Sequence, residues 1–303
     1  MFVDRITTTN EKAGISPLFS CLKENKMSSI QKYTVNGHSV WRGRLNKING
    51  QNIDNGPHFT IRPLSTADTK NMGKLSAEIY RHLGSGEECF IHKHEPSYYH
   101  QAVQNPDNRY IGIFVGEQLV AMSYLKICRN HQQFSDEIPN SPLNFFNTPN
   151  TRIAALGADS VLPTYRGNNL NQIMIDYRLE LAKNLHCNGA ASIIDRSNHW
   201  NMPPYFNNGF RMYATAIDPA DGGKIALMHH NLKTQTNLPQ RGVNVPFASF
   251  NLIDKLLAKG YVGCGYNKDT ATLTFVQTAQ RTPVHGIEQN IMFNSLRGKV
   301  CNM

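Results

Sequence analysis

The feature that most constrains the fold is the stretch from Ala154 to Asn171, where an extended run ends in a loop rich in Gly and Asn. The loop opens an amphipathic helix, and a helix start leaves backbone N–H groups unpaired and carries partial positive charge. Phosphate oxygens bind at such positions, Arg166 adds a full charge, and Gly167 lets the backbone approach a ligand closely. The stretch therefore predicts an anion site, with an ordinary strand-to-helix turn as the alternative.

A helix and a strand are predicted directly after this loop. Apolar side chains recur at helical spacing from Leu170 to Leu185, and Asn188-Gly189 predicts the helix end. The short apolar run from Ala190 to Asp195 contains β-branched residues and predicts a buried strand. Beyond that strand the chain carries, in order, Asn198, Tyr205 and the pair Gly209-Phe210.

Together these residues resemble the acetyl-CoA-binding core of the GCN5-related N-acetyltransferases, the GNAT family. In that family the loop between the fourth strand and the third helix holds the pyrophosphate of coenzyme A. Its pattern is Arg or Gln, two arbitrary residues, Gly, one arbitrary residue, and Gly or Ala. Arg166 matches, whereas Asn169 and Asn171 stand at the two small positions. Asn tolerates left-handed dihedrals, but its side chain fills space that the phosphates normally take, so the departure bears on cofactor affinity. The resemblance extends from about His58 to Leu232.

The resemblance implies a site for acetyl-CoA, the acyl donor. Val161 and Pro163 match the strand end whose backbone groups pair with the pantetheine arm. Tyr205 matches the Tyr that lies near the thioester sulfur. The residues implied to bind the cofactor are Val161, Arg166, Gly167, Asn168, Asn169, Leu170, Asn171 and Asn198.

Acetyl transfer to an amine needs proton transfers that side chains can perform. A primary amine with a pKa of about 10.4 is mostly protonated at neutral pH and must lose a proton before it attacks the thioester. Asp159, two residues before Val161 on the same face of the strand, is the predicted base, with a local cap or ion pair as the alternative. Tyr205 is the predicted acid for the departing thiolate, with packing on Phe210 as the alternative. No GxSxG elbow or local Cys–His pair is present, so direct transfer is predicted.

These elements predict an α/β protein (α+β) with a GNAT-like acyl-CoA N-acyltransferase fold, in which a mixed, largely antiparallel sheet opens between its fourth and fifth strands. Residues 1–57 are expected to form an N-terminal extension, with a β-hairpin at Asn36-Gly37 and a linker at 51–56. Residues 58–232 are the expected acetyltransferase domain. Residues 233–303 are the expected accessory α+β extension, and a second, degenerate acyltransferase unit is the alternative for them.

Turn and capping signals predict the remaining elements of the central domain. A strand is expected over His58 to Leu64, followed by a helix with Ser65 and Asp68 at its N-cap and a stop at residues 84–86. A short helix is expected from Glu95. Hairpins are expected about Gly116-Glu117 and between Asp218 and Gly223.

The segment from Arg129 to Asn150 is predicted to be a long loop, and the resemblance places it beside the acceptor site. Long loops of this kind are commonly lids. Phe145 and Phe146 are the predicted substrate-binding residues. Asp136 and Glu137 are expected either to attract a cationic amine or to form a solvated acidic turn. The expected partner is a small-molecule or peptide amine.

Charge leaves two other functions open. The chain carries 31 Lys and Arg against 22 Asp and Glu, a net charge of +9 that suits the phosphates of the coenzyme. A basic nucleic-acid-binding module is one alternative, although no compact Lys/Arg tract or aromatic RNA-binding signature is present and nucleic acid is not the expected partner. A catalytically weak acyl-CoA sensor or scaffold is the other, and Asn169 and Asn171 favour it.

Metal and membrane sites are not predicted. His92, His94 and the pair His229-His230 lack a third ligand at suitable spacing. No apolar run is long enough to span a bilayer, no N-terminal targeting segment is evident, and six cysteines stand singly without a CxxC pair. A cytoplasmic protein without a membrane partner is therefore expected. The sequence leaves open the oligomeric state, the acyl-chain preference and the identity of the acceptor.

Overall fold

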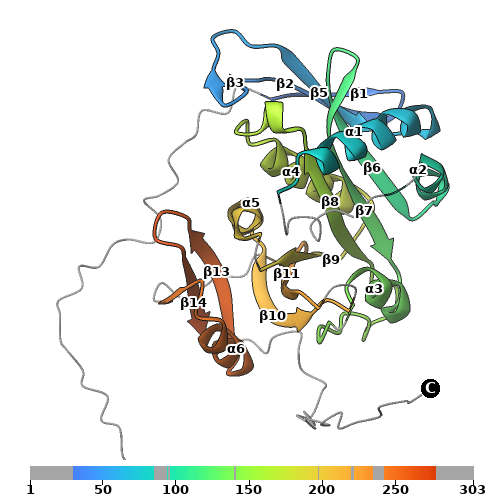
Figure 1. Cartoon of the computed structure of the whole chain (residues 1–303). Helices are drawn as coiled ribbons and strands as arrows, with labels where there is room; N and C mark the ends of the chain where they lie inside the picture. Colours follow the sequence, from blue (N-terminus) through green and yellow to red (C-terminus); the bar gives the residue numbers. More distant parts are fainter. Residues whose placement is uncertain are drawn as a thin grey trace, which may run out of the picture.

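The chain is a mixed α/β protein built on one large sheet (Figure 1). The computed structural model describes residues 30–84, 94, 96–139, 141–196, 198–219, 222–234 and 242–277. A separate short hairpin joins β3 (Lys47–Ile48) to β4 (Gln51–Asn52). Within the described residues 12 strands form the sheet, in the spatial order β1 (Gln31–Val35), β2 (His38–Arg44), β5 (His58–Pro63), β6 (Asn108–Val115), β7 (Gln118–Cys128), β8 (Ile153–Val161), β9 (Gly189–Asp195), β11 (Lys224–Asn231), β10 (Arg211–Ile217), β13 (Tyr261–Asn267), β14 (Thr272–Gln277) and β12 (Val243–Pro246).

The sheet opens at its one parallel pair. Among the described strands, β8 and β9 run parallel and every other neighbouring pair is antiparallel. The parallel pairing ends at Leu156↔Ser192, although β8 continues to Val161 and β9 to Asp195. Past that point each strand still pairs with its outer neighbour, β8 with β7 and β9 with β11. The predicted opening between the fourth and fifth strands of the central domain is confirmed, and we call it the β8–β9 gap.

Helices cover both faces of the sheet. α4 (Leu170–Asn184), α5 (Met202–Asn207) and α6 (Phe250–Ala258) share one apolar cluster with Leu125 of β7. Tyr124 precedes Leu125 and so points to the opposite face. There it stacks on Tyr110, whose ring touches α2 (Pro96–Gln104). α3 (His131–Glu137) reaches the Tyr124 face through Glu137, and α1 (Thr69–Arg81) packs beside α2.

The predicted start of the first helix is confirmed. A 3-10 turn, η1 (Thr66–Asp68), precedes α1, and Ser65 N donates to Asp68 Oδ2 at 2.8 Å. Arg62 Nη2 donates to Asp68 Oδ1 at 2.8 Å, which ties β5 to the helix start. α1 ends at Arg81, earlier than predicted, and most of the predicted stop at 84–86 lies outside the described residues. Glu95 also lies outside them, and α2 begins at Pro96.

Both flanking segments lengthen the same sheet, one at each edge. Asn36 and Gly37 have φ of +51° and +77°, as a type I′ turn requires, and join β1 to β2 as predicted. The expected linker at 51–56 is wrong, because its first two residues form β4 and Leu45 N donates to Pro57 O at 3.0 Å just outside it. At the other edge β13 pairs with β10, and β14 and β12 follow.

Two further boundaries differ from the prediction. α4 ends at Asn184 because His186 adopts a left-handed φ of +57° and the N–H of Cys187 bonds back to Ala182 O at 2.9 Å. Gly189 consequently begins β9 and does not end the helix. The expected long loop at 129–150 contains α3, which Asn130 caps by accepting from Gln133 N at 2.9 Å.

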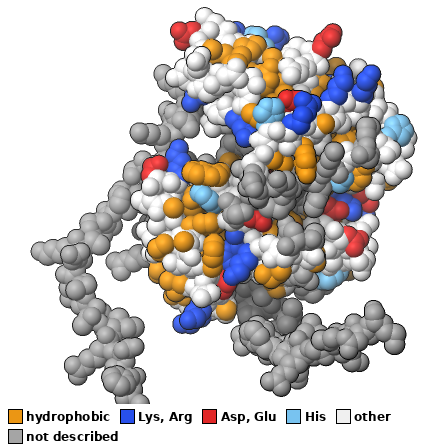
Figure 2. Space-filling view, in the orientation of Figure 1, with side chains coloured by type: hydrophobic (Ala, Val, Ile, Leu, Met, Phe, Trp, Pro, Cys, Tyr) orange, Lys and Arg blue, Asp and Glu red, His pale blue; other side chains and the backbone are white. Residues whose placement is uncertain are grey.

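The surface mixes charged and apolar side chains (Figure 2). Lys and Arg side chains are spread over several parts of the visible face, and hydrophobic side chains gather over β13, β14 and α6. The exposed large hydrophobic residues of the described chain include Leu252 on α6, Val243 on β12 and Trp200 in η4 (His199–Asn201).

Candidate active site

The loop before α4 has the backbone of an anion site. After the 3-10 turn η3 (Pro163–Tyr165), Gly167 has φ +83° and Asn169, the N-cap residue, has φ +55°. Asn169 thus takes the left-handed conformation that its residue type predicts. Among the described residues, no backbone carbonyl accepts from the N–H groups of residues 167–172. Six consecutive donors are therefore available at the positive end of a 15-residue helix.

Two cations flank this loop. The Arg166 side chain is exposed, and its Nε donates to Val161 O at 3.3 Å, which folds the side chain back along the end of β8. Lys47 lies on the other side, since a Cβ built on Gly167 would lie 3.3 Å from Lys47 Cδ. The sequence does not predict Lys47 at this site, because Lys47 belongs to the hairpin β3–β4, which is distant from the loop in the sequence.

Asn168 locks that hairpin onto the loop. Its Oδ1 accepts from the N–H groups of Asn46 at 2.8 Å and Lys47 at 2.9 Å. Its Nδ2 donates to Lys47 O at 2.8 Å and to Tyr165 O at 2.9 Å. The side chain of Asn168 is therefore fully engaged within the protein, whereas its backbone N–H has no backbone acceptor among the described residues.

The remaining loop residues are more deeply placed. Leu170 is buried under the first turn of α4. Asn171 Nδ2 donates to Asn201 Oδ1 at 3.2 Å, which links the start of α4 to η4. Asn171 Oδ1 is buried and has no hydrogen-bond partner among the described residues. An additional donor beside it would satisfy this oxygen.

A bulge in β8 lies beside the gap. The register with β7 passes from Tyr124↔Gly157 to Met122↔Ser160, so Ala158 and Asp159 together oppose Ser123. Ala158 has φ +53°, a left-handed conformation that is strained for a residue with a Cβ. A bulge bends its strand and re-aims side chains. Here it turns β8 away from β9 directly after the last parallel pair.

Four polar side chains meet at the gap. Tyr205 Oη of α5 donates to Asp159 Oδ2 at 2.8 Å and accepts from Ser192 Oγ of β9 at 3.1 Å. Arg178 Nη2 of α4 forms an ion pair with Asp159 Oδ1 at 2.6 Å. We call Asp159, Arg178, Ser192 and Tyr205 the gap cluster. The structure thus brings together the two predicted catalytic residues and adds two that the prediction missed.

Burial sets the protonation states of the gap cluster. It raises the pKa of Tyr205 well above the usual value for a phenol, and the negative charge of Asp159 raises it further. Burial alone would lower the pKa of Arg178, but Asp159 reverses the effect and the net shift is upward. A neutral phenol and a charged guanidinium therefore both hold Asp159. Its two oxygens are engaged, as the predicted alternative of a local ion pair describes.

The other predicted site residues lie outside the gap cluster. Asn198 is the N-cap of η4, and its N–H donates to Asp195 O at 2.9 Å, directly after β9. Phe145 and Phe146 pack on Phe134 of α3 at ring distances of 5.3 and 6.0 Å, and Phe145 stacks on His229 at 4.5 Å. Both are part of an apolar layer over β8, β9 and β11.

Among the described residues, no group of three or more His, Cys, Asp or Glu side chains gathers as a metal site would require, and His92 lies outside these residues. No described helix is long and apolar enough to cross a membrane. Cys128, Cys187 and Cys264 are free thiols.

Comparison with known proteins gives structural similarity at low sequence identity. The chain matches no protein-family model and no curated protein. It is similar to an N-acetyltransferase from Staphylococcus aureus Mu50, with 12% identity, 58% of this chain and 99% of that chain covered, and a TM-score of 0.44. NAA60 of Arabidopsis thaliana in complex with acetyl-CoA matches with 13% identity over 57% of this chain and 99% of its own, at a TM-score of 0.44. A probable acetyltransferase from Staphylococcus epidermidis ATCC 12228 matches with 15% identity over 58% and 99%, at a TM-score of 0.44.

Proposed function

We propose that this protein is an N-acetyltransferase that passes the acetyl group of acetyl-CoA directly to a primary amine. The β8–β9 gap carries the proposal. Past Leu156 and Ser192 two internal strand edges face each other without pairing, and an extended ligand such as the pantetheine arm can pair with an edge of this kind. The gap cluster lies at the same point, so a thioester held there would meet a phenol and a carboxylate.

The loop before α4 suits the pyrophosphate of the same molecule. It offers unpaired N–H groups at a helix start, an exposed Gly167 and two flanking cations, Arg166 and Lys47. Asn169 supplies the left-handed backbone that Gly provides in the family pattern. The remaining difference from Gly is side-chain bulk, which bears on affinity. Acetyl-CoA, when bound, supplies the activated thioester, and the protein's residues bind it and move protons.

Tyr205 is the residue we assign to proton donation. Its raised pKa keeps the phenol protonated at neutral pH, and a phenol can protonate a leaving thiolate. We assign Asp159 to orienting that phenol and not to accepting the proton of the amine. Protonation of Asp159 would leave the fully buried charge of Arg178 without a partner, which costs several kcal/mol. Phe145 and Phe146 remain proposed neighbours of the acceptor.

A coenzyme sensor or scaffold without turnover is the second candidate. The observation that favours it is the bond of Tyr205 Oη to Asp159, which directs the phenolic proton toward a carboxylate. The side chains of Asn169 and Asn171 also favour the sensor or scaffold, because they take up space in the phosphate loop. Binding of CoA without release of free thiol in the presence of amines would support this candidate over the transferase.

Ligand-induced thermal stabilisation tests the donor site. CoA and acetyl-CoA should raise the melting temperature clearly more than NAD or ATP do, because the site recognises the pantetheine arm as well as the pyrophosphate. Equal shifts for all four ligands would indicate a generic polyanion site. The double variant Arg166→Ala/Gly167→Val should weaken CoA binding in calorimetry, since it removes a charge and forces a β-branched side chain into a φ of +83°. Unchanged affinity would show that the loop is wrongly assigned.

A further inference from the structure

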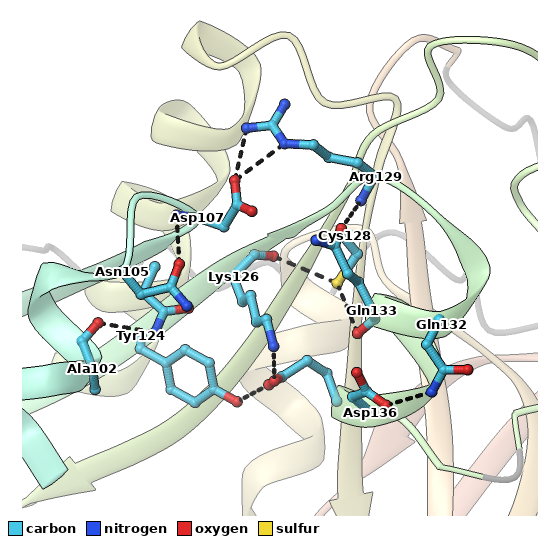
Figure 3. A network of polar contacts seen from close by, with 12 residues as sticks. Ala102, Asn105, Asp107, Tyr124, Lys126, Cys128, Arg129, Gln132, Gln133 and Asp136 are labelled. Carbon is cyan, nitrogen blue, oxygen red and sulfur yellow. Dashed lines mark hydrogen bonds and ion pairs between the residues drawn. The ribbon is translucent and has the colours of Figure 1, made fainter.

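A second phenol–carboxylate pair lies on the other face of the sheet. Tyr124 Oη donates to Glu137 Oε2 of α3 at 2.5 Å, and Lys126 Nζ donates to Glu137 Oε1 at 2.7 Å. Figure 3 shows Tyr124 and Lys126 reaching the same carboxylate from β7. The Lys126 and Glu137 side chains are 19% and 16% exposed, so this pair lies near the surface. None of its three members has a place in the donor site described above.

Tyr124 is placed against the mouth of the gap by a missing side chain. A Cβ built on Gly157 would lie 2.7 Å from Tyr124 Cε1 and 3.1 Å from Tyr124 Oη. Gly157 follows the last parallel pair and precedes the bulge at Ala158 and Asp159. Only Gly at this position lets the phenol lie directly on β8 where the strands separate.

The two phenols approach this point from opposite sides. Tyr205 belongs to α5 and shares a cluster with Leu125, whereas Tyr124 points to the face of α2 and α3. A thioester in the gap would therefore have one phenol on the side of its sulfur and the other on the side open to an acceptor. Aromatic rings line that second side, since Tyr124 stacks on Tyr110 at 5.5 Å, and Tyr98 of α2 is 42% exposed. Such rings attract cations.

We propose that Tyr124 and Glu137 deprotonate the acceptor, a primary alkylammonium, on this face. In the step, a proton of the ammonium passes to Tyr124 Oη while the phenolic proton passes to Glu137 Oε2. The products are a neutral amine, an unchanged phenol and a protonated carboxyl, and no other bond is made or broken. Lys126 is a positioning residue that holds the second oxygen of Glu137. The inference rests on the proposed transferase function.

The cations beside the two carboxylates explain why Glu137, and not Asp159, takes this proton. Protonation of Asp159 would leave the charge of Arg178, whose side chain is 0% exposed, without a counter-charge. Protonation of Glu137 leaves Lys126, whose flexible side chain lies near the surface and can turn to solvent. The titratable groups that face Glu137 are Lys126, Cys128 and Tyr124 on β7, Tyr110 on β6 and Asp136 on α3.

The test compares Glu137→Gln with Glu180→Gln on α4, whose partly exposed carboxylate forms an ion pair with Lys32 at 2.6 Å. The full chain is assayed with acetyl-CoA and butylamine, with release of free thiol as the readout from pH 6 to 10, and CoA binding is measured by calorimetry. Glu137→Gln and Tyr124→Phe should lower kcat about 100-fold at neutral pH. The loss should shrink toward pH 10, where the amine deprotonates unaided, and Glu180→Gln, which lies outside the proposed site, should match the wild type.

The outcomes separate this inference from the function on which it rests. Failure of the wild type to bind CoA overturns both. Binding with turnover, but with a pH profile of Glu137→Gln that is parallel to the profiles of the wild type and of Glu180→Gln, overturns the role of Glu137 alone. CoA binding by a wild type that releases no thiol supports the sensor and also overturns this step. If Tyr124→Phe fails to fold, Glu137→Gln, which keeps the size of the side chain, decides the matter.

Discussion

The hydroxyl of Tyr205 donates a hydrogen bond to Asp159 Oδ2 at 2.8 Å, and this bond joins α5 to the bulged end of β8 at the point where β8 and β9 separate. The bond links a residue at a predicted acid position to one at a predicted base position. Substitutions of the two residues therefore test different properties, because Tyr205 carries the transferable proton and Asp159 carries the charge that faces Arg178.

Replacing Tyr205 by Phe tests the acid. The ring keeps its edge-to-face contact with Phe210, at 5.0 Å, but the hydroxyl is lost. We expect turnover to fall about 10- to 1000-fold while CoA affinity changes little. Steady-state kinetics with one amine acceptor and calorimetry with CoA check this, and unchanged turnover would remove Tyr205 as the acid.

Replacing Asp159 by Asn tests the buried ion pair. Because Arg178 is fully buried, losing its counter-charge should cost about 3–5 kcal/mol in the free energy of unfolding. The double variant Asp159→Asn/Arg178→Met should recover much of that loss, since it removes both charges. Urea denaturation of the three proteins measures the energies. Additive losses in the double variant would mean that the pair does not couple the two residues.

Replacing Asn168 by Ala tests the lock between the phosphate loop and the hairpin β3–β4. Four hydrogen bonds disappear, three of them to the backbone of Asn46 and Lys47. We expect a loss of about 1–3 kcal/mol in stability, faster amide exchange over residues 46–52, and weaker CoA binding because Lys47 is no longer held beside Gly167. Asn168→Asp keeps the acceptor atom and is the matched control. Its stability and CoA affinity should lie between those of the wild type and those of Asn168→Ala. Fast exchange without any change in CoA affinity would separate Lys47 from the site.

Replacing His229 by Phe tests a pH dependence of stability. Burial, with a smaller contribution from His230, lowers the pKa of His229 to about 3 from its usual 6.5. As pH falls, the unfolded chain therefore binds the proton first. The contribution of neutral His229 is complete above about pH 6.5 and is lost between about 6.5 and 3, at up to about 1.4 kcal/mol per pH unit. His229→Phe keeps the ring stacked on Phe145 and should flatten the curve of unfolding free energy in that window. His131→Gln, on the exposed side of α3, should leave the curve unchanged.

The sequence predicts the central fold well because its signals are local. The loop at Arg166 to Asn171, the capping pair Ser65 and Asp68, and the turn at Asn36-Gly37 each specify a backbone conformation within a few residues. The family pattern predicts Tyr205 beside the thioester, and strand alternation predicts Asp159 on the same face as Val161, so the sequence predicts both residues in one site. The structure adds that the two residues contact each other, which their spacing in the sequence does not show.

Other parts of the site depend on contacts between distant segments. Lys47 lies beside Gly167 because it belongs to the hairpin β3–β4, whose second strand falls in the segment 51–56 that the sequence predicts as a linker, and its N–H donates to Asn168 Oδ1 from 121 residues away. Arg178 follows Tyr177 on an amphipathic helix that also carries Asp176, Glu180 and Lys183, where a charge is as readily expected to face solvent as to enter the core. The bulge at Ala158 has no sequence signal, since Ala in a left-handed conformation is unfavourable and is held there by tertiary structure.

The order of the strands also bears on aggregation through exposed strand edges. Its two outer strands are poor templates for another chain: every residue of β1 is exposed and Lys32 projects from it, while β12 has four residues and ends at Pro246. Within the described strands, the unpaired backbone edges of β8 and β9 lie instead in the interior of the sheet, between flanking strands. A strand of a neighbouring molecule cannot reach these two edges, because β7 and β11 lie on either side of them, so the gap adds no template for aggregation.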